Sequence, residues 1–233
     1  MDNYSKNTPL IELRNITVSY PERGIILDNI SFSIYKGDRI GIYGANGSGK
    51  TTLLYTMVGL IKHEKGEIKI FGEKMMSEKD FFKVRKKIGF LFQDSDDQLF
   101  SPTVEEDIAF GPLNLRLPRE EIERKVENTI KLLGIENLRY RFSQTLSYGE
   151  KRIVAIATIL SMEPEIYLLD EPTTGLDRKS RGKIEKFLLE KEITYCIVSH
   201  EISFLKKACQ RLFLLENGKI SPFVFNKEEI EFI

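Results

Sequence analysis

The chain has 233 residues, of which 41% are hydrophobic and 30% are charged, the balance of a globular rather than a disordered protein. Its 35 basic and 35 acidic side chains cancel, so it lacks the basic excess typical of nucleic-acid-binding proteins, and we expect no nucleic-acid partner. No apolar run reaches the ~20 residues of a spanning helix, the first residues show no apolar signal core, and the cysteines have no metal-ligand or redox spacing.

The first part of the chain predicts short strands joined by turns. Alternating apolar residues predict strands over residues 10–20 and around residues 30–34, and a short apolar strand follows over residues 40–43. After a glycine-rich loop, the pattern predicts a helix over about residues 50–60 and a strand over residues 67–71.

The middle of the chain is predominantly helical. A buried strand over residues 88–92 precedes a helical pattern from residue 103 to about residue 160. Within it, one apolar face is formed by Ile122, Val126, Ile130 and Leu133, and Gly134 ends that helix. The block of about residues 94–160 is therefore predicted to be an inserted helical subdomain.

From residue 165 onward, strands and helices alternate again. The pattern predicts strands over residues 166–170 and 194–199, a helix over residues 178–189 and a final hairpin around Asn217 and Gly218. Strands that alternate with helices are typical of a parallel sheet, so we expect an α/β fold.

The segment Gly44–Thr51, which we call the phosphate loop, matches the pattern G-x-x-x-x-G-K-[ST] without a departure. Glycines let the backbone curl so that successive amides face phosphate oxygens, and the following helix adds the positive end of its dipole. We predict that Lys50 contacts the outer phosphates of ATP and that the Thr51 hydroxyl coordinates Mg²⁺. The predicted ATP-binding residues here are Gly44, Ala45, Asn46, Gly47, Ser48, Gly49, Lys50, Thr51 and Thr52.

Two adjacent acids, Asp170 and Glu171, follow the apolar strand 166–169. Ligands of open α/β sheets bind at the carboxyl ends of the strands, so we expect both side chains to lie at a binding edge. Beside a phosphate loop, Asp170 is predicted to hold the Mg²⁺ and Glu171 to act as the base that polarises the attacking water.

These motifs occur in the order and spacing of a known family. The chain resembles the nucleotide-binding domains of ABC transporters over roughly residues 10–220. The motifs are Gly44–Thr51, Gln93, Leu146–Glu150, Asp170–Glu171, Gly175–Asp177 and His200. The resemblance implies a P-loop NTPase core with an N-terminal antiparallel β subdomain and the inserted helical subdomain, all in one nucleotide-binding domain over residues 1–233.

The resemblance also implies roles for individual residues. Gln93 would touch the metal and the attacking water, and His200 would be the switch histidine, so these two join Glu171 as catalytic residues. Tyr20 matches an aromatic that stacks on adenine, with simple packing at a strand end as the alternative. Contacts to the ATP held by an opposite subunit would come from Ser147, Gly149, Glu150 and Asp177.

A finer likeness lies in residues 89–114, where Asp96–Phe100 reads D-D-Q-L-F. This stretch resembles the ATPase of energy-coupling-factor importers, especially the cobalt and nickel branch. The resemblance implies an ATP-hydrolysing subunit at the cytoplasmic face of the cell membrane. Its partners would be integral membrane subunits and a second ATPase subunit, for which an identical copy of this chain is favoured. A vitamin importer of the same type, a soluble non-transport ABC ATPase and a non-hydrolysing regulatory subunit are the alternatives.

Two local features add expectations. Tyr148 replaces the first glycine of the usual signature; either it weakens closure of the ATP-bound dimer, or its ring points outward and neighbouring amides serve the phosphate. Between Gln93 and Phe110, six acids surround the apolar pair Leu99 and Phe100, which suits a socket for a basic helix of the membrane partner. The acids are Asp94, Asp96, Asp97, Glu105, Glu106 and Asp107.

Overall fold

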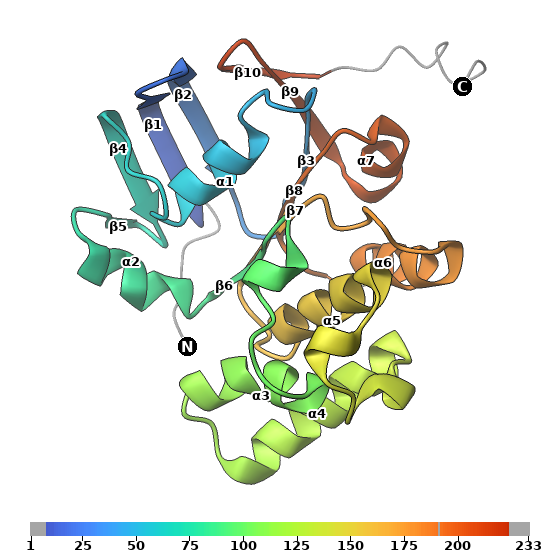
Figure 1. The fold of residues 1–233 in the computed structure, drawn as a ribbon. Coiled ribbons are helices and arrows are strands. Elements are labelled where there is room, and N and C mark those ends of the chain that lie inside the picture. The colour runs from blue at the N-terminus through green and yellow to red at the C-terminus, as the bar shows by residue number, and fades with distance from the viewer. Residues whose placement is uncertain (1–7, 191, 224–233) are drawn as a thin grey trace. The chain divides into compact units, whose positions relative to one another are not determined.

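The computed structural model describes residues 8–190 and 192–223. The chain divides into two compact units: Met1–Met75 with Cys196–Ile233 form the first unit, and Met76–Tyr195 form the second. The helices and strands of both units are labelled in Figure 1.

The first unit contains a four-stranded antiparallel sheet in the order β2-β1-β4-β5. Its strands are β1 (Ile11–Tyr20), β2 (Gly24–Ile34), β4 (Lys65–Ile70) and β5 (Glu73–Lys74). Leu13 on β1 lies opposite Phe32 on β2 and Ile68 on β4, and all three side chains are buried. Alternation with a period of two residues therefore gives the sheet one apolar face, which confirms the antiparallel β region.

A second set of strands in the first unit runs in the order β10-β9-β3-β8. These are β3 (Arg39–Tyr43), β8 (Tyr195–Ser199), β9 (Arg211–Glu216) and β10 (Lys219–Pro222), accompanied by the helices α1 (Lys50–Met57) and α7 (Ile202–Ala208). β3 pairs with β9 in parallel, and β9 pairs with β10 as the predicted hairpin. Its turn residues Asn217 and Gly218 have φ of 50° and 74°, the two positive values of a type I′ turn.

Helix α1 ends at Met57, earlier than the predicted residue 60. The chain turns at Gly59, whose φ of 72° lies in the left-handed region that glycine adopts without steric cost. The apolar residues beyond Met57 therefore belong to a turn, although their spacing continues the helical pattern.

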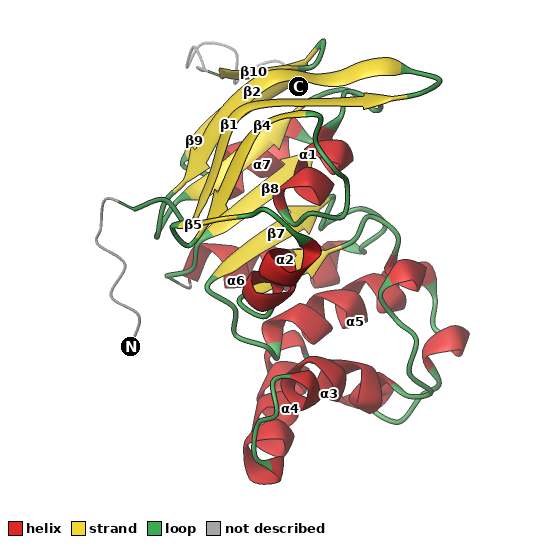
Figure 2. Cartoon of the chain, turned by 90° about the vertical axis from the view of Figure 1, so that its left-hand side faces the viewer, coloured by secondary structure: helices red, strands yellow, loops and turns green. Residues whose placement is uncertain are grey.

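The second unit contains three helices that pack on one another: α3 (Val104–Asn114), α4 (Arg119–Leu133) and α5 (Tyr148–Leu160). Figure 2 shows them in red as one group. On α4 the buried residues include Val126, Ile130 and Leu133, and Gly134 ends the helix with φ of 57°, both as predicted. The apolar spacing of α4 thus directs one face into the helical core.

The second unit also contains the parallel pair β6 (Ile88–Leu91) and β7 (Ile166–Asp170), in which Ile88 lies opposite Ile166 and Leu91 opposite Leu169. The helices α2 (Glu78–Arg85) and α6 (Arg178–Glu190) complete the unit. Every residue of β7 is buried, as expected for an apolar strand within a parallel sheet. Together with the first unit, this confirms the mixed α/β class.

Candidate functional site

The phosphate loop of the first unit runs from the end of β3 to the start of α1. Gly47 and Gly49 have φ of 81° and 100°, values that a residue with a Cβ atom rarely adopts. A Cβ atom on Gly44 would lie 2.6 Å from the carbonyl oxygen of Leu215 on β9, so packing also requires glycine there. The strand–loop–helix context that the motif requires is therefore present.

The lysine of the loop is directed back into the loop itself. Lys50 is only 7% exposed, and its Nζ donates hydrogen bonds to the carbonyl oxygens of Gly44 at 2.8 Å and Ala45 at 3.0 Å. These bonds hold the ammonium group within the curve of the loop. A positive charge next to successive backbone amides at a helix start forms an arrangement that attracts an anion.

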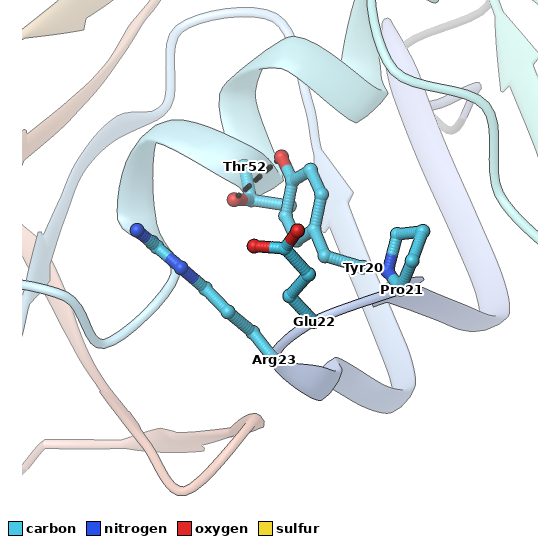
Figure 3. A pocket seen from close by; sticks show the side chains of 5 residues that line it. All are labelled: Tyr20, Pro21, Glu22, Arg23 and Thr52. Atoms are coloured by element: carbon cyan, nitrogen blue, oxygen red, sulfur yellow. Dashed lines mark hydrogen bonds between the residues drawn. The ribbon is translucent and has the colours of Figure 1, made fainter.

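Two cavities of the first unit border this region. Tyr20, at the end of β1, lines a cavity of about 460 Å³ with Pro21, Glu22, Arg23 and Thr52. Figure 3 shows the Tyr20 hydroxyl next to Thr52 of α1, with 3.4 Å between Oη and Oγ1. On another side of the loop, Ala45–Ser48 line a cavity of about 580 Å³ together with residues of β9 and its turn. An aromatic ring and a phosphate loop thus both contact α1.

His200 follows the buried strand β8 directly and is exposed. The neighbouring Ser199 is buried, and its Oγ accepts a hydrogen bond from the backbone N–H of Glu201 at 3.1 Å. This bond fixes the backbone on both sides of the histidine, so that the ring stands at the end of a strand, as predicted.

In the second unit, the predicted carboxylates lie at the end of β7. Asp170 is 1% exposed and Glu171 is 6% exposed, so both carboxyl groups are buried. Glu171 has φ of 47°, a left-handed value that costs a residue other than glycine free energy and is concentrated at functional sites. The buried Thr173 lies two residues further on, within the turn that leads to Asp177.

A residue to which the sequence assigned no role joins the carboxylates to the Gln93 region. The Arg152 side chain is fully buried; its Nη1 donates to the carbonyl oxygens of Phe92 at 2.5 Å and Gln93 at 3.2 Å. Its Nη2 donates to the carbonyl oxygens of Asp170 and Glu171, the latter at 2.7 Å. One guanidinium therefore holds the ends of β6 and β7 together. The sequence signal that could have indicated this role is the position of the arginine directly before the apolar run of α5.

Gln98 has a similar structural role that was also missed. Its Oε1 accepts from the backbone N–H of Phe92 at 3.2 Å, and its Nε2 donates to the carbonyl oxygen of Ala155 at 2.9 Å and to Oγ1 of Thr158 at 2.7 Å. The loop that begins with the exposed Gln93 is thereby attached to α5.

The signature segment forms the start of α5. Ser147 is the N-cap, and its Oγ accepts from the backbone N–H of Glu150 while the Glu150 carboxylate accepts from the backbone N–H of Ser147 at 2.8 Å. The hydrogen bond from the Ser147 backbone is the main reason that the pKa of Glu150 is lowered, and Arg141 pairs with the same carboxylate at 2.7 Å. The capping box defines where the helix begins.

Asp177 caps the next helix in a comparable way. Its carboxylate accepts hydrogen bonds from the backbone N–H groups of Lys179 at 2.8 Å and Ser180 at 3.0 Å, and from the Ser180 hydroxyl at 2.8 Å. The bond from the Ser180 backbone contributes most to the lowered pKa of Asp177. Asp177 and Ser147 are both exposed, so each cap lies at the surface of the described chain.

The acidic stretch after Gln93 is only partly the ring that was predicted. Asp107 is 2% exposed and accepts from the backbone N–H of Ser101 at 2.8 Å and the Ser143 hydroxyl at 2.6 Å, so it is a core acceptor. Glu105 pairs with Arg139, and Glu106 caps α3. The prediction that Asp107 belongs to an exposed acidic ring is wrong, because its carboxylate is buried and accepts hydrogen bonds inside the unit. The exposed acids of the stretch are Asp94, Asp96, Asp97 and Glu106, and Glu105 is half-buried.

No helix in the described ranges 8–190 and 192–223 combines the length and apolar character needed to cross a bilayer.

Comparisons with known proteins agree with this geometry. The ABC transporter family profile matches residues 27–174. The chain is 44% identical over 215 residues to the energy-coupling factor transporter ATP-binding protein EcfA of Methanothermobacter thermautotrophicus, covering 91% of this chain and 69% of that protein. It is 40% identical to the protein of the same name from Methanocaldococcus jannaschii, covering 91% of this chain and 77% of that protein.

Solved structures give the same result. The cbiO1 structure of Clostridium perfringens, described as part of the ABC transporter complex cbiONQ, superimposes with a TM-score of 0.80 at 36% identity, covering 91% of this chain and 87% of that one. The ATP-binding cassette MJ0796, solved as a dimer bound to ADP and Pi, gives a TM-score of 0.81 at 27% identity, covering 93% of this chain and 100% of that one.

Proposed function

Since this chain belongs to the ABC transporter family and is an ATP-binding ATPase that resembles the energy-coupling-factor type, we propose that it powers a membrane importer of that type. The observation that carries the proposal is the phosphate loop, in which the buried Lys50 lies inside a glycine-rich turn between β3 and α1. Residues 1–233 act as one nucleotide-binding domain.

ATP binds along the phosphate loop. Its outer phosphates take over the hydrogen bonds that Lys50 makes to the carbonyl oxygens of Gly44 and Ala45, and the loop amides and Thr52 add donors. Adenine stacks on Tyr20; the cavity of about 460 Å³ beside that ring supports this assignment. The remaining contacts come from the loop residues Ala45, Asn46, Gly47, Ser48, Gly49 and Thr51.

The donors available for Mg²⁺ are the Thr51 hydroxyl, the Gln93 amide oxygen and the Asp170 carboxylate, a set of hard oxygen ligands that this ion prefers. A carboxylate that is 1% exposed also suits a cation, because removing a negative charge from water costs free energy that a positive charge offsets. When bound, the ion neutralises charge on the phosphates. Glu171 accepts the proton of the attacking water, Gln93 orients that water, and His200 contacts the γ-phosphate.

Two copies of the chain assemble head to tail. In this assembly Ser147, Gly149, Glu150 and Asp177 face the ATP of the opposite copy. The exposed position of Ser147 at the amino end of α5, where backbone N–H groups attract anions, supports this role. Glu150 contributes through the capping box, which orients these amides.

The membrane subunits dock on an exposed apolar cluster of the second unit. The rings of Phe100 and Phe110 pack edge to face with their centroids 4.5 Å apart, yet they are 64% and 43% exposed. Leu113, one turn after Phe110 on α3, is 56% exposed. The exposed acids Asp94 and Asp97 precede Phe100 closely along the chain, and their charge suits a basic, amphipathic helix. The ATPase then lies at the cytoplasmic face of the membrane.

The cargo that we propose is a cobalt or nickel ion. The D-D-Q-L-F run of Asp96–Phe100 favours it, whereas an importer that takes up a vitamin is the alternative within the same type. A soluble ABC ATPase without a transport role is a further alternative.

A transport assay separates these functions. The chain is expressed with its membrane partners, and ATP-dependent uptake of labelled Co²⁺, Ni²⁺ and vitamins is measured beside a Lys50→Ala complex. Metal uptake that requires Lys50 is the expected result. Uptake of a vitamin instead of a metal would show that the proposed cargo is wrong. A chain that hydrolyses ATP but never co-purifies with a membrane protein would overturn the transport role.

A further inference from the structure

The aromatic ring that departs from the family signature packs on the loop after the carboxylates. A Cβ atom on Gly175 would lie 2.1 Å from Cε1 of Tyr148 and 2.3 Å from its Cδ1. No side chain fits between the two residues, so the ring rests directly on the Gly175 backbone. Gly175 also has φ of 75°, so glycine suits this position on two independent grounds.

The next residue of α5 makes the same approach through its backbone. A Cβ atom on Gly149 would lie 3.0 Å from the carbonyl oxygen of Gly175. The first turn of α5 therefore meets Gly175 at two successive positions, once with a ring and once with a bare backbone.

One turn further along α5, Arg152 holds the other end of the same loop. Its guanidinium binds the carbonyl oxygens of Asp170 and Glu171. The loop also has bonds of its own, from Thr174 N–H to the Glu171 carbonyl oxygen at 3.2 Å and from Leu176 N–H to the Thr173 carbonyl oxygen at 3.3 Å. Tyr148 and Arg152 thus brace the segment 170–175 at both ends from one helix.

We propose that Tyr148 is a positioning residue for ATP hydrolysis, which it serves by bracing the segment that carries Glu171. This rests on the proposed role of Glu171 as the base. Glu171 has a strained backbone, and a strained conformation persists only where its surroundings enforce it. The ring is 51% exposed, but its Cδ1 and Cε1 atoms lie against Gly175, so on this proposal a tyrosine in place of the signature glycine is not a handicap.

The contact predicts which part of the side chain matters. The atoms nearest to Gly175 are the ring carbons Cε1, Cδ1 and Cζ. Tyr148→Phe keeps them all, so it is expected to retain activity within about twofold. Tyr148→Ala removes the ring and is expected to lower kcat roughly 10- to 100-fold with little change in KM for ATP, since a small misplacement of a catalytic group has an effect of this size.

Steady-state ATPase kinetics of the full chain test this, with Tyr140→Ala as the matched control because Tyr140 is a 73% exposed tyrosine of the same unit. Wild-type kcat in Tyr148→Ala, an equal loss in Tyr148→Phe, or a loss confined to KM would each overturn the proposal. Glu171→Gln is expected to accumulate an ATP-bound dimer. If adding Tyr148→Ala to that variant abolishes the dimer, the ring acts between subunits, and this result would also overturn the proposal.

A double mutant tests the contact itself. Gly175→Ala forces a methyl group against the ring and is expected to lower kcat in the wild-type background. In the Tyr148→Ala background, the loss of kcat caused by Gly175→Ala should be about tenfold smaller, because the effects of mutating two contacting residues are not additive. The strain of a positive φ at residue 175 is the same in both backgrounds and does not contribute to this difference. Additive effects would contradict the brace. Wild-type hydrolysis by Glu171→Gln alone would instead remove the assignment of the base.

Discussion

The phosphate loop of the first unit and the carboxylate segment of the second unit are stabilised in opposite ways. In the loop, Lys50 binds carbonyl oxygens only 6 and 5 residues away along the chain. In the segment 170–175, Arg152 binds the carbonyl oxygens of Asp170 and Glu171, which lie 18 and 19 residues after it in the chain. It also binds the carbonyl oxygens of Phe92 and Gln93, which lie 60 and 59 residues before it. The first site is thus formed by local backbone geometry, and the second depends on tertiary contacts.

The difference has a consequence for mutation. Side-chain changes in the loop should alter ligand binding with little effect on the surrounding fold. Changes in the contacts of the segment should alter stability and catalysis together. Four substitutions examine this contrast.

Glu171→Gln is expected to have the largest effect. It removes the proposed base while nearly preserving the volume of the side chain, so hydrolysis should fall roughly 10²–10⁴-fold, and ATP binding should persist. Single-turnover hydrolysis and size-exclusion chromatography with saturating ATP measure both, and an ATP-bound dimer should accumulate. Glu192→Gln, at an exposed glutamate, is the control. A wild-type rate would refute the role of Glu171.

Lys50→Ala should weaken ATP binding by roughly 100-fold, because hydrogen bonds from a charged group contribute about 1.5–3 kcal/mol each. Titration with ATP measures the change, and Lys62→Ala, at an exposed lysine, is the control. The thermal unfolding midpoint without nucleotide should fall less than in Arg152→Lys, because Lys50 binds two carbonyl oxygens of one loop, whereas Arg152 binds four at the ends of two strands. Unchanged affinity would mean that the loop is not the ATP site.

Arg152→Lys should act on stability as well as catalysis. Lysine keeps the charge but cannot span four carbonyl oxygens with a planar fork, and the lost bonds should lower the free energy of unfolding by roughly 2–3 kcal/mol. Thermal unfolding and kcat are measured together, beside Arg124→Lys at an exposed site on α4. Full stability with reduced kcat would show that the guanidinium serves only the chemistry.

Asp97→Lys should have the smallest effect, a reduction of about two- to fivefold in binding of the membrane subunits, because exposed charge pairs contribute little. Asp96 is less suitable for this test, since it already pairs with Lys151 at 2.6 Å. Pull-down of the membrane subunits at two salt concentrations measures the effect, with Glu192→Lys as the control. Equal recovery at both would contradict the docking surface.

Much of this protein could be predicted from its sequence. The phosphate loop, the apolar strand before Asp170, the face of α4 and the hairpin at Asn217 all depend on residues close together along the chain, and the structure contains each of them. Glycine positions, apolar periodicity and turn residues act through local sterics, so a short window of sequence is sufficient.

Only the tertiary structure decided how distant segments meet. It assigned Arg152 to the ends of β6 and β7, Tyr148 to Gly175 and Asp107 to the core. An arginine, a tyrosine or an aspartate has no preferred partner that its neighbours in sequence can specify, because burial and hydrogen bonding depend on which backbone groups the fold brings near. For this chain the sequence by itself therefore determined the motifs and the family, whereas the tertiary structure decided which side chains contact the carboxylate segment.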